Sequence, residues 1–145
     1  MAAYAEIDPA DAERVLPYRW RFGAYDHVMA DDGGSLICLQ RLILGLAPGD
    51  GLQADHIDLN PLNNRRSNLR IVTPAQNAQN QRGHGGSSPH RGVTWNRSCA
   101  RWQAQVKLAG KNHYLGLFVE EADAARAAAD FRRAHMPFSQ EALAA

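Results

Sequence analysis

The sequence predicts an α+β fold, because strand-like and helix-like segments are interleaved along its 145 residues. Residues 101–108 alternate polar and apolar side chains, which is the pattern of a strand with one buried face. Residues 120–135 form an Ala-rich segment with the character of a helix, and Gly, Asn and Asp clusters separate the shorter elements. A chain of this length can bury one sizeable core or two small ones.

The first block, residues 1–50, is expected to be a small α+β scaffold. Asp8-Pro9 favours the start of a helix, since Pro is well tolerated in the first helical turn. The elements expected in this block are a helix over 10–16, strands over 19–22 and 24–29, a turn at 31–34, and an apolar strand-to-helix run over 36–44.

The second block holds two short strands, a turn and a helix. Strands are predicted over residues 53–57 and 69–72, with an Asn-rich turn between them. Thr73 and Pro74 are typical of a helix start, and this helix is expected to run to about Gln81.

The third block is expected to form a separate domain. The segment 81–89 is rich in Gly and Ser and is predicted to be a flexible linker. Beyond it, three strands and one helix are predicted. The expected organisation is a scaffold with the second block over residues 1–80, the linker over 81–89, a second domain over 90–139, and a tail over 140–145.

Charge is strongly segregated although the net charge is only +1. Between Leu59 and Val119 there is no Asp or Glu, while nine Lys and Arg residues occur. Such a run is often a solvated face, but a long stretch of one sign also attracts polyanions. Here it favours nucleic acid as the partner.

Other features limit the class of protein. No apolar run approaches the length of a membrane span, and no export signal is visible, so a cytoplasmic location in a bacterial or phage-infected cell is expected. Cys38 and Cys99 are isolated, which argues against both a disulfide framework and a four-ligand zinc site.

The segment from Ala54 to Asn80 carries the strongest functional signal. It contains Asp55-His56, then Asn68, then Asn77 on the predicted helix. The residue types and their spacing resemble the motif of the HNH endonucleases, in particular the homing-type enzymes of phages and mobile elements. The resemblance implies a ββα-metal core in which two short strands and a helix surround one divalent ion, and it implies hydrolysis of DNA phosphodiester bonds.

The resemblance also implies a role for each motif residue. His56 would be the general base, a task suited to a side chain with an unperturbed pKa of about 6.5. Asn68 would tie the turn to the strand and help to hold the imidazole. Asp55 and Asn77 would bind one Mg²⁺ or Mn²⁺, since hard cations prefer oxygen ligands. The basic residues expected to contact flanking phosphates here are Arg65, Arg66 and Arg70.

The third block carries a second resemblance. The strings HRGVTW, RWQAQV, YLGLF and EADAARAAADF are similar to the ethylene-response-factor (APETALA-type) DNA-binding domain. That family packs three antiparallel strands on one helix and reads double-stranded DNA with the sheet. The DNA-binding candidates in this block are Arg91, Arg101, Gln103, Gln105, Lys107 and Tyr114.

Several alternatives stay open. Taken singly, each Asn of the motif is better explained as a turn or cap residue, and only the combination favours the nuclease. Gln40 stands where related nucleases often have a His, so reduced activity is possible, and the runner-up function is a catalytically weak or silent DNA-binding or regulatory protein. The sequence does not decide between nicking by a monomer and double-strand cleavage by a homodimer, nor does it give the recognition sequence.

Overall fold

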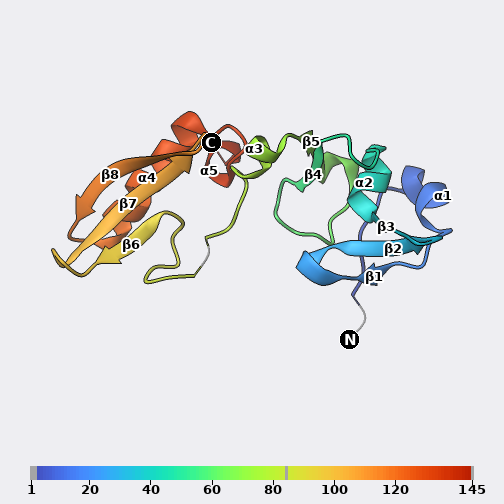
Figure 1. Cartoon of the computed structure of the whole chain (residues 1–145), viewed down its shortest axis with the longest axis horizontal. Coiled ribbons are helices and arrows are strands. Elements are labelled where there is room, and N and C mark those ends of the chain that lie inside the picture. The colour runs from blue at the N-terminus through green and yellow to red at the C-terminus, as the bar shows by residue number, and fades with distance from the viewer. Residues whose placement is uncertain (1–2, 84, 145) are drawn as a thin grey trace. The chain divides into compact units, whose positions relative to one another are not determined.

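The computed structural model describes residues 3–83 and 85–144, and it has the α+β fold that the sequence predicts (Figure 1). The strands form three antiparallel sheets in the orders β1-β2-β3, β4-β5 and β6-β7-β8. The chain divides into two compact units, one ending at Asn77 and the other beginning at Ala78. We call them the N-terminal and C-terminal units.

The scaffold of the N-terminal unit surrounds a small apolar core. Its elements are η1 (Pro9–Asp11), α1 (Ala12–Val15), β1 (Arg21–Phe22), η2 (Ala24–Asp26), β2 (Val28–Asp32), β3 (Ser35–Cys38) and α2 (Leu39–Leu44). The core consists of Val15, Val28, Leu39, Ile43 and Leu69.

Two turns of the scaffold show where the local sequence predicted the backbone conformation correctly and where it did not. The predicted turn after β2 is present, and the Asp31 carboxylate accepts the Gly34 N–H at 2.9 Å. The expected strand over 24–29 is wrong in its first half, where residues 24–26 form a 3-10 turn. Asp26 has a φ of 56°, a left-handed conformation that does not occur in a regular strand.

The second block forms a hairpin followed by a short helix. Its elements are β4 (Gln53–His56), η3 (Arg66–Asn68), β5 (Leu69–Val72) and α3 (Pro74–Asn77). The two predicted strands are confirmed to within one residue. The helix ends four residues earlier than predicted, and the chain beyond it is bound by a side chain. Arg91 donates to the carbonyl oxygens of Ala78, Gln79 and Gln81.

The C-terminal unit is a three-stranded sheet with a helix on one face. It consists of β6 (Val93–Asn96), β7 (Arg101–Leu108), β8 (Lys111–Phe118), α4 (Glu121–His135) and α5 (Gln140–Leu143). The predicted alternation of β7 is confirmed, because Trp102, Ala104 and Val106 belong to the core beneath α4. At Ala104/Gln105 the pairing of β7 with β8 shifts by one residue, a β-bulge that places Tyr114 opposite Gln105.

The segments expected to be a linker and a tail are both attached to the C-terminal unit. Ser87 Oγ accepts the Trp95 N–H at 2.7 Å, and Ser88 is 5% exposed. Residues 140–143 form α5, which Ser139 caps and which an ion pair of 2.6 Å between Glu141 and Arg132 holds against α4. Among the described residues, no helix is long and apolar enough to cross a membrane.

Candidate active site

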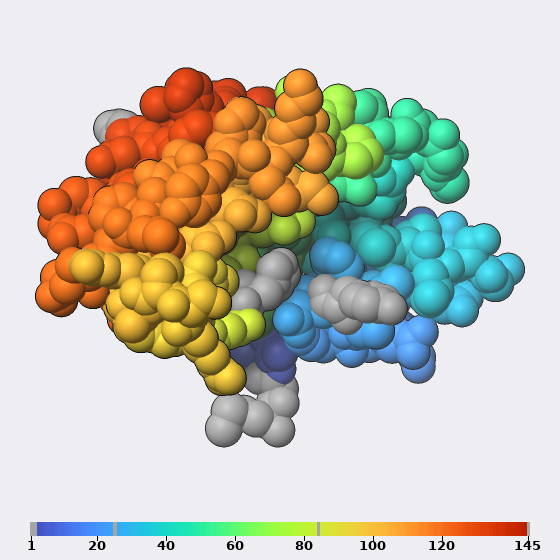
Figure 2. Space-filling model, turned by 60° about the vertical axis from the view of Figure 1, so that its left-hand side comes forward, coloured from blue at the N-terminus to red at the C-terminus, as the bar shows by residue number. Residues whose placement is uncertain are grey.

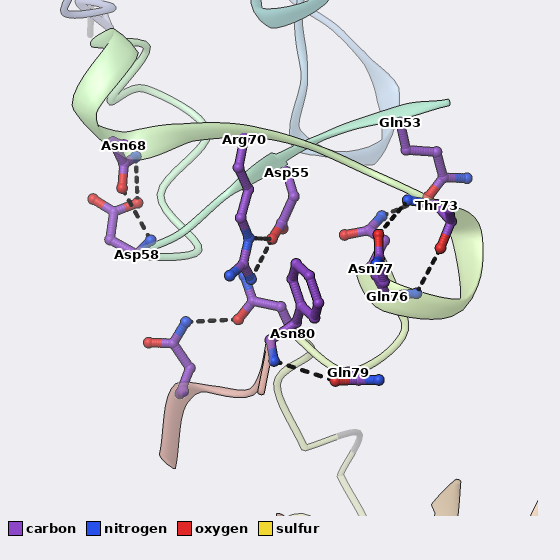
Figure 3. Close-up of polar contacts among 12 residues, drawn as sticks. Gln53, Asp55, Asp58, Asn68, Arg70, Thr73, Gln76, Asn77, Gln79 and Asn80 are labelled. Atoms are coloured by element: carbon purple, nitrogen blue, oxygen red, sulfur yellow. Dashed lines mark hydrogen bonds and ion pairs between the residues drawn. The ribbon is translucent and has the colours of Figure 1, made fainter. Parts of the chain in front are cut away.

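One face of the β4–β5 hairpin collects the predicted metal ligands. Gln53 and Asp55 lie two residues apart on β4 and therefore share a face, and the register places Arg70 directly opposite Asp55. Asn77 reaches this face from α3, where its Nδ2 donates to Gln53 Oε1 at 2.7 Å (Figure 3). The amide oxygen of Asn77 is therefore the atom that can act as a ligand.

The carboxylate of Asp55 is held by Arg70. Nε and Nη2 of Arg70 both approach Asp55 Oδ2, at 2.7 and 2.6 Å, and the carboxylate is 5% exposed (Figure 3). Burial of a carboxylate in this way requires a cationic partner. Arg70, predicted to contact a DNA phosphate, is here the counter-ion of the predicted metal ligand.

A buried hydrogen bond selects the tautomer of the neutral His56 ring. Asn64 is 0% exposed, and its Nδ2 donates to the Pro61 carbonyl at 2.9 Å, so its Oδ1 is an acceptor. That oxygen lies 3.0 Å from His56 Nε2. The neutral imidazole must therefore carry its proton on Nε2, which leaves Nδ1 as the basic nitrogen.

Asn68 ties the turn between the two strands. Its Oδ1 accepts the Asp58 N–H at 3.0 Å, and its Nδ2 donates to Asp58 Oδ1 and to the Asn63 carbonyl, each at 2.8 Å (Figure 3). Burial tends to raise the pKa of Asp58, but hydrogen bonds from Asn63, Asn60 and Asn68 together hold it below its usual value. Asn68 thus performs the predicted tying of the turn, while Asn64 binds the imidazole.

Asp55 and His56 are successive residues of β4, so their side chains leave opposite faces of the strand. His56 is the last residue of β4, and the turn that Asn68 holds follows directly after it. A phosphate that contacts both side chains must therefore lie at this end of the strand rather than over one face.

A second histidine lies close to His56. His27 Nδ1 is 3.2 Å from Gln40 Nε2, and burial followed by the charge of His56 lowers the pKa of His27. Gln40 is 4% exposed, and in the described part of the chain its Oε1 has no hydrogen-bond partner. The position where related nucleases often have a His is thus filled by an amide that contacts His27, the residue just before β2.

Sequence reasoning missed both Asn64 and His27. Asn64 stood in a polar turn where Asn is expected for backbone reasons alone, so nothing separated it from Asn63. His27 lies far from the motif in sequence, and no local pattern connects it with His56.

Besides Arg70, three of the predicted DNA-contacting arginines have partners within the chain. Arg65 makes an exposed ion pair of 3.3 Å with Glu6. Arg66 binds the 3%-exposed Asp11 with two nitrogens and also donates to the Ile43 carbonyl. Arg91 is the residue whose guanidinium binds the carbonyl groups that follow α3.

The face of the C-terminal sheet away from α4 is polar. Strand alternation and register assign to it Thr94, Asn96, Arg101, Gln103, Gln105, Lys107, Asn112, Tyr114 and Leu117. We call it the open face, and Figure 2 shows side chains of β7 and β8 at the surface of this unit. Arg101 and Lys107 are exposed, and the described residues offer neither of them an ion pair.

The predicted metal ligands, Asp55 and Asn77, carry oxygen donors, the type that hard cations prefer. Within residues 3–83 and 85–144 no group of three or more His, Cys, Asp or Glu side chains converges. Asp55 and Asn77 provide two oxygen atoms, which matches the few protein ligands that Mg²⁺ usually takes. Asn80, the other Asn near α3, is 3% exposed and accepts from Gln140 within the C-terminal unit at 2.6 Å (Figure 3).

Comparisons with known proteins identify a family over this part of the chain. Residues 40–79 match the HNH endonuclease family. The chain is 31% identical over 116 residues to an uncharacterized HNH endonuclease of Acanthamoeba polyphaga mimivirus, covering 77% of this chain and 59% of that protein. It is 36% identical over 64 residues to Protein 3.8 of Escherichia phage T7, covering 43% of this chain and 53% of that protein.

These relatives are longer than the alignments, since the chain spans little more than half of each. No solved structure matches significantly. The chain therefore has an α+β fold that contains an HNH endonuclease domain.

Proposed function

We propose that this chain, with its HNH endonuclease domain, is a metal-dependent DNA endonuclease whose C-terminal unit binds the DNA. The observation that carries the proposal is the orientation of His56 inside the matched segment. The hydrogen bond from Nε2 to Asn64 leaves Nδ1 able to accept a proton.

In the proposed reaction, His56 Nδ1 takes a proton from a water molecule as the oxygen of that water attacks phosphorus. The bond from phosphorus to the 3′ oxygen breaks, and that oxygen leaves with the electron pair. Asn64 keeps the ring in the reactive tautomer, and Asn68 holds the turn that follows it. General base catalysis of this kind contributes roughly 10²- to 10⁴-fold to the rate.

Asp55 and Asn77 are the residues that would hold a divalent cation. When bound, such an ion would supply positive charge to the scissile phosphate and the leaving oxygen. The same face carries Arg70, whose guanidinium is within reach of Asp55 and is chemically suited to a phosphate oxygen.

The open face of the C-terminal unit supports DNA binding. Arg101 and Lys107 stand at the two ends of β7 without intramolecular counter-ions among the described residues, and two glutamines lie between them. The chain from Leu59 to Val119 has no acidic residue that would repel a phosphate.

A plasmid-relaxation assay tests the proposal. Supercoiled plasmid incubated with the full chain and Mg²⁺ or Mn²⁺ should be converted to the open-circle or linear form, and EDTA should stop the conversion. His56→Ala should lower the rate by roughly 10²- to 10⁴-fold with DNA affinity nearly unchanged. The matched control His90→Ala, at an exposed site of the C-terminal unit, should cut as the wild type does. Equal rates for His56→Ala and the wild type would contradict the assigned base.

A second function is favoured by the ion pair between Arg70 and Asp55. This pair neutralises the only carboxylate of the proposed metal site. If it persists when metal is added, the chain would bind DNA without cutting it. Tight binding to plasmid with no cleavage under any metal condition would establish that alternative.

A further inference from the structure

The two glutamines of the open face each have an apolar neighbour on β8. Gln103 pairs with Leu117, and the β-bulge places Tyr114 opposite Gln105. Leu117 and Tyr114 are 44% and 57% exposed, although most apolar side chains of this sheet lie beneath α4. The open face therefore carries the same arrangement twice. In each, a glutamine amide lies beside an exposed apolar side chain.

The amides are ordered by hydrogen bonds to one another. Asn96 Nδ2 donates to Gln103 Oε1, and Gln103 Nε2 donates to Gln105 Oε1, each at 3.3 Å. After these bonds are made, each glutamine keeps at least one N–H and one oxygen lone pair for another molecule. Binding would therefore not have to order these side chains from a free state.

An adenine·thymine base pair is complementary to a glutamine amide beside an apolar side chain. In the major groove, adenine presents N7 as an acceptor and N6 as a donor, which a glutamine amide matches with two hydrogen bonds. The same base pair carries the thymine methyl group beside these atoms. Guanine presents two acceptors, which match the N–H groups of an amide but leave its oxygen unpaired, and cytosine lacks the methyl group.

We infer that the open face reads adjacent adenine·thymine pairs in the major groove, with Gln103 and Gln105 on adenine and Leu117 and Tyr114 on thymine methyl groups. The inference rests on the proposed DNA binding of this unit and names the base pairs that it prefers.

The charged residues near the two ends of β7 are consistent with placing the open face in the major groove. Arg101 and Lys107 are six residues apart, which corresponds to roughly 20 Å along a strand. Since the major groove is about 12 Å wide, both side chains can reach phosphates on its two sides while the glutamines face the bases.

The experiment selects duplexes from a randomised 20-base-pair library with the full chain in EDTA, so that no DNA is cut. Selected duplexes should contain adjacent A·T pairs. In the best duplex, each thymine at those pairs is then replaced by uracil, which removes only the methyl group. Wild-type affinity, measured by fluorescence anisotropy, should fall about fourfold at a contacted thymine, the worth of burying one methyl group.

A double-mutant comparison assigns the contact. Leu117→Ala should lose affinity for the thymine duplex but should not distinguish thymine from uracil at one position. Leu143→Ala, which removes an equally exposed leucine from α5, should behave as the wild type does. At the adenine that Gln105 contacts, replacement by 7-deazaadenine should lower the DNA affinity of the wild type about tenfold. The same replacement should lower the affinity of Gln105→Ala much less.

The outcomes distinguish a failure of the base-pair preference from a failure of DNA binding. Salt-dependent binding with no A·T enrichment, or with equal affinity for thymine and uracil duplexes at every position, would overturn the inference and leave DNA binding intact. Failure to retain any duplex at low salt would overturn the proposed DNA binding itself, and the inference with it.

Discussion

Replacing Asn64 by Ala should both destabilise the N-terminal unit and impair the proposed base. The Asn64 side chain is fully buried and makes two hydrogen bonds, one from His56 Nε2 and one to the Pro61 carbonyl. Its backbone N–H donates to Glu6 at 2.8 Å, a bond that the substitution leaves in place. The effect should therefore come from the lost side-chain amide and not from a lost backbone hydrogen bond.

The loss in free energy of unfolding can be worked out from the two polar groups that Asn64→Ala leaves without a partner. His56 is 8% exposed, so its Nε2–H would lose its partner where water has little access. The Pro61 carbonyl is only half-buried and can be partly rehydrated. At about 1–3 kcal/mol for each buried polar group left unpaired, the free energy of unfolding should fall by about 2–4 kcal/mol. For a unit of this size, that is a fall in Tm of about 10 °C or more.

Asn63→Ala is the matched control in the same turn. Asn63 Nδ2 makes an exposed hydrogen bond with Asp58, while its buried Oδ1 has no partner among the described residues. Its removal should change the free energy of unfolding by no more than about 1 kcal/mol.

Thermal unfolding followed by circular dichroism, together with plasmid cleavage, measures both effects of Asn64→Ala. In addition, the Nε2 proton of His56 should give a protected NMR signal in the wild type that is lost in this variant. Equal Tm values for Asn64→Ala and Asn63→Ala, with the protected signal retained in both, would refute the reasoning.

Three further predictions follow from the other contacts. Arg70→Gln should bind Mn²⁺ about five- to tenfold more tightly in an EPR titration, because the ion pair no longer competes for Asp55; unchanged affinity would mean that no competition exists. Burial and the charge of His56 lower the pKa of His27 in the folded state, so the unfolded chain takes up this proton first as the pH falls below about 6.5. The free energy of unfolding should then fall with pH, and denaturant titrations of His27→Asn should show a flatter dependence. Arg101→Ala and Lys107→Ala should each reduce the slope of log K against log[salt] by about one unit in anisotropy titrations, and unchanged slopes would exclude phosphate contacts.

The elements that the sequence predicted well are those whose pattern is local. The alternation of β7 marked its buried and open faces, and the turn residues around β4 and β5 marked both strands. The helix after Pro74 was predicted four residues too long, and the carbonyl groups of the chain beyond it bind Arg91, which is distant in sequence. Local propensity contains no information about that contact.

The site was predictable to the same extent. The family resemblance pointed to the motif residues, and the structure places Asn77 of α3 in contact with Gln53, which shares a face of β4 with Asp55. The partners of those residues were not predictable. Whether Arg70 binds Asp55 or a phosphate depends on strand register, and the contact of Asn64 with His56 depends on how the intervening turn folds back.

The contact of Arg91 with the chain that follows α3 bears on how this protein can be divided and recombined. Burial and the nearby Arg132 lower the pKa of Arg91, and its charge is compensated mainly by the three backbone oxygens that it binds and by Glu141. A transplanted module that starts at the Gly- and Ser-rich segment would leave this half-buried cation without two of those oxygens, the carbonyls of Ala78 and Gln79. The exchangeable piece, in a laboratory fusion or in the shuffling of genes, should begin at Ala78, the first residue of the C-terminal unit.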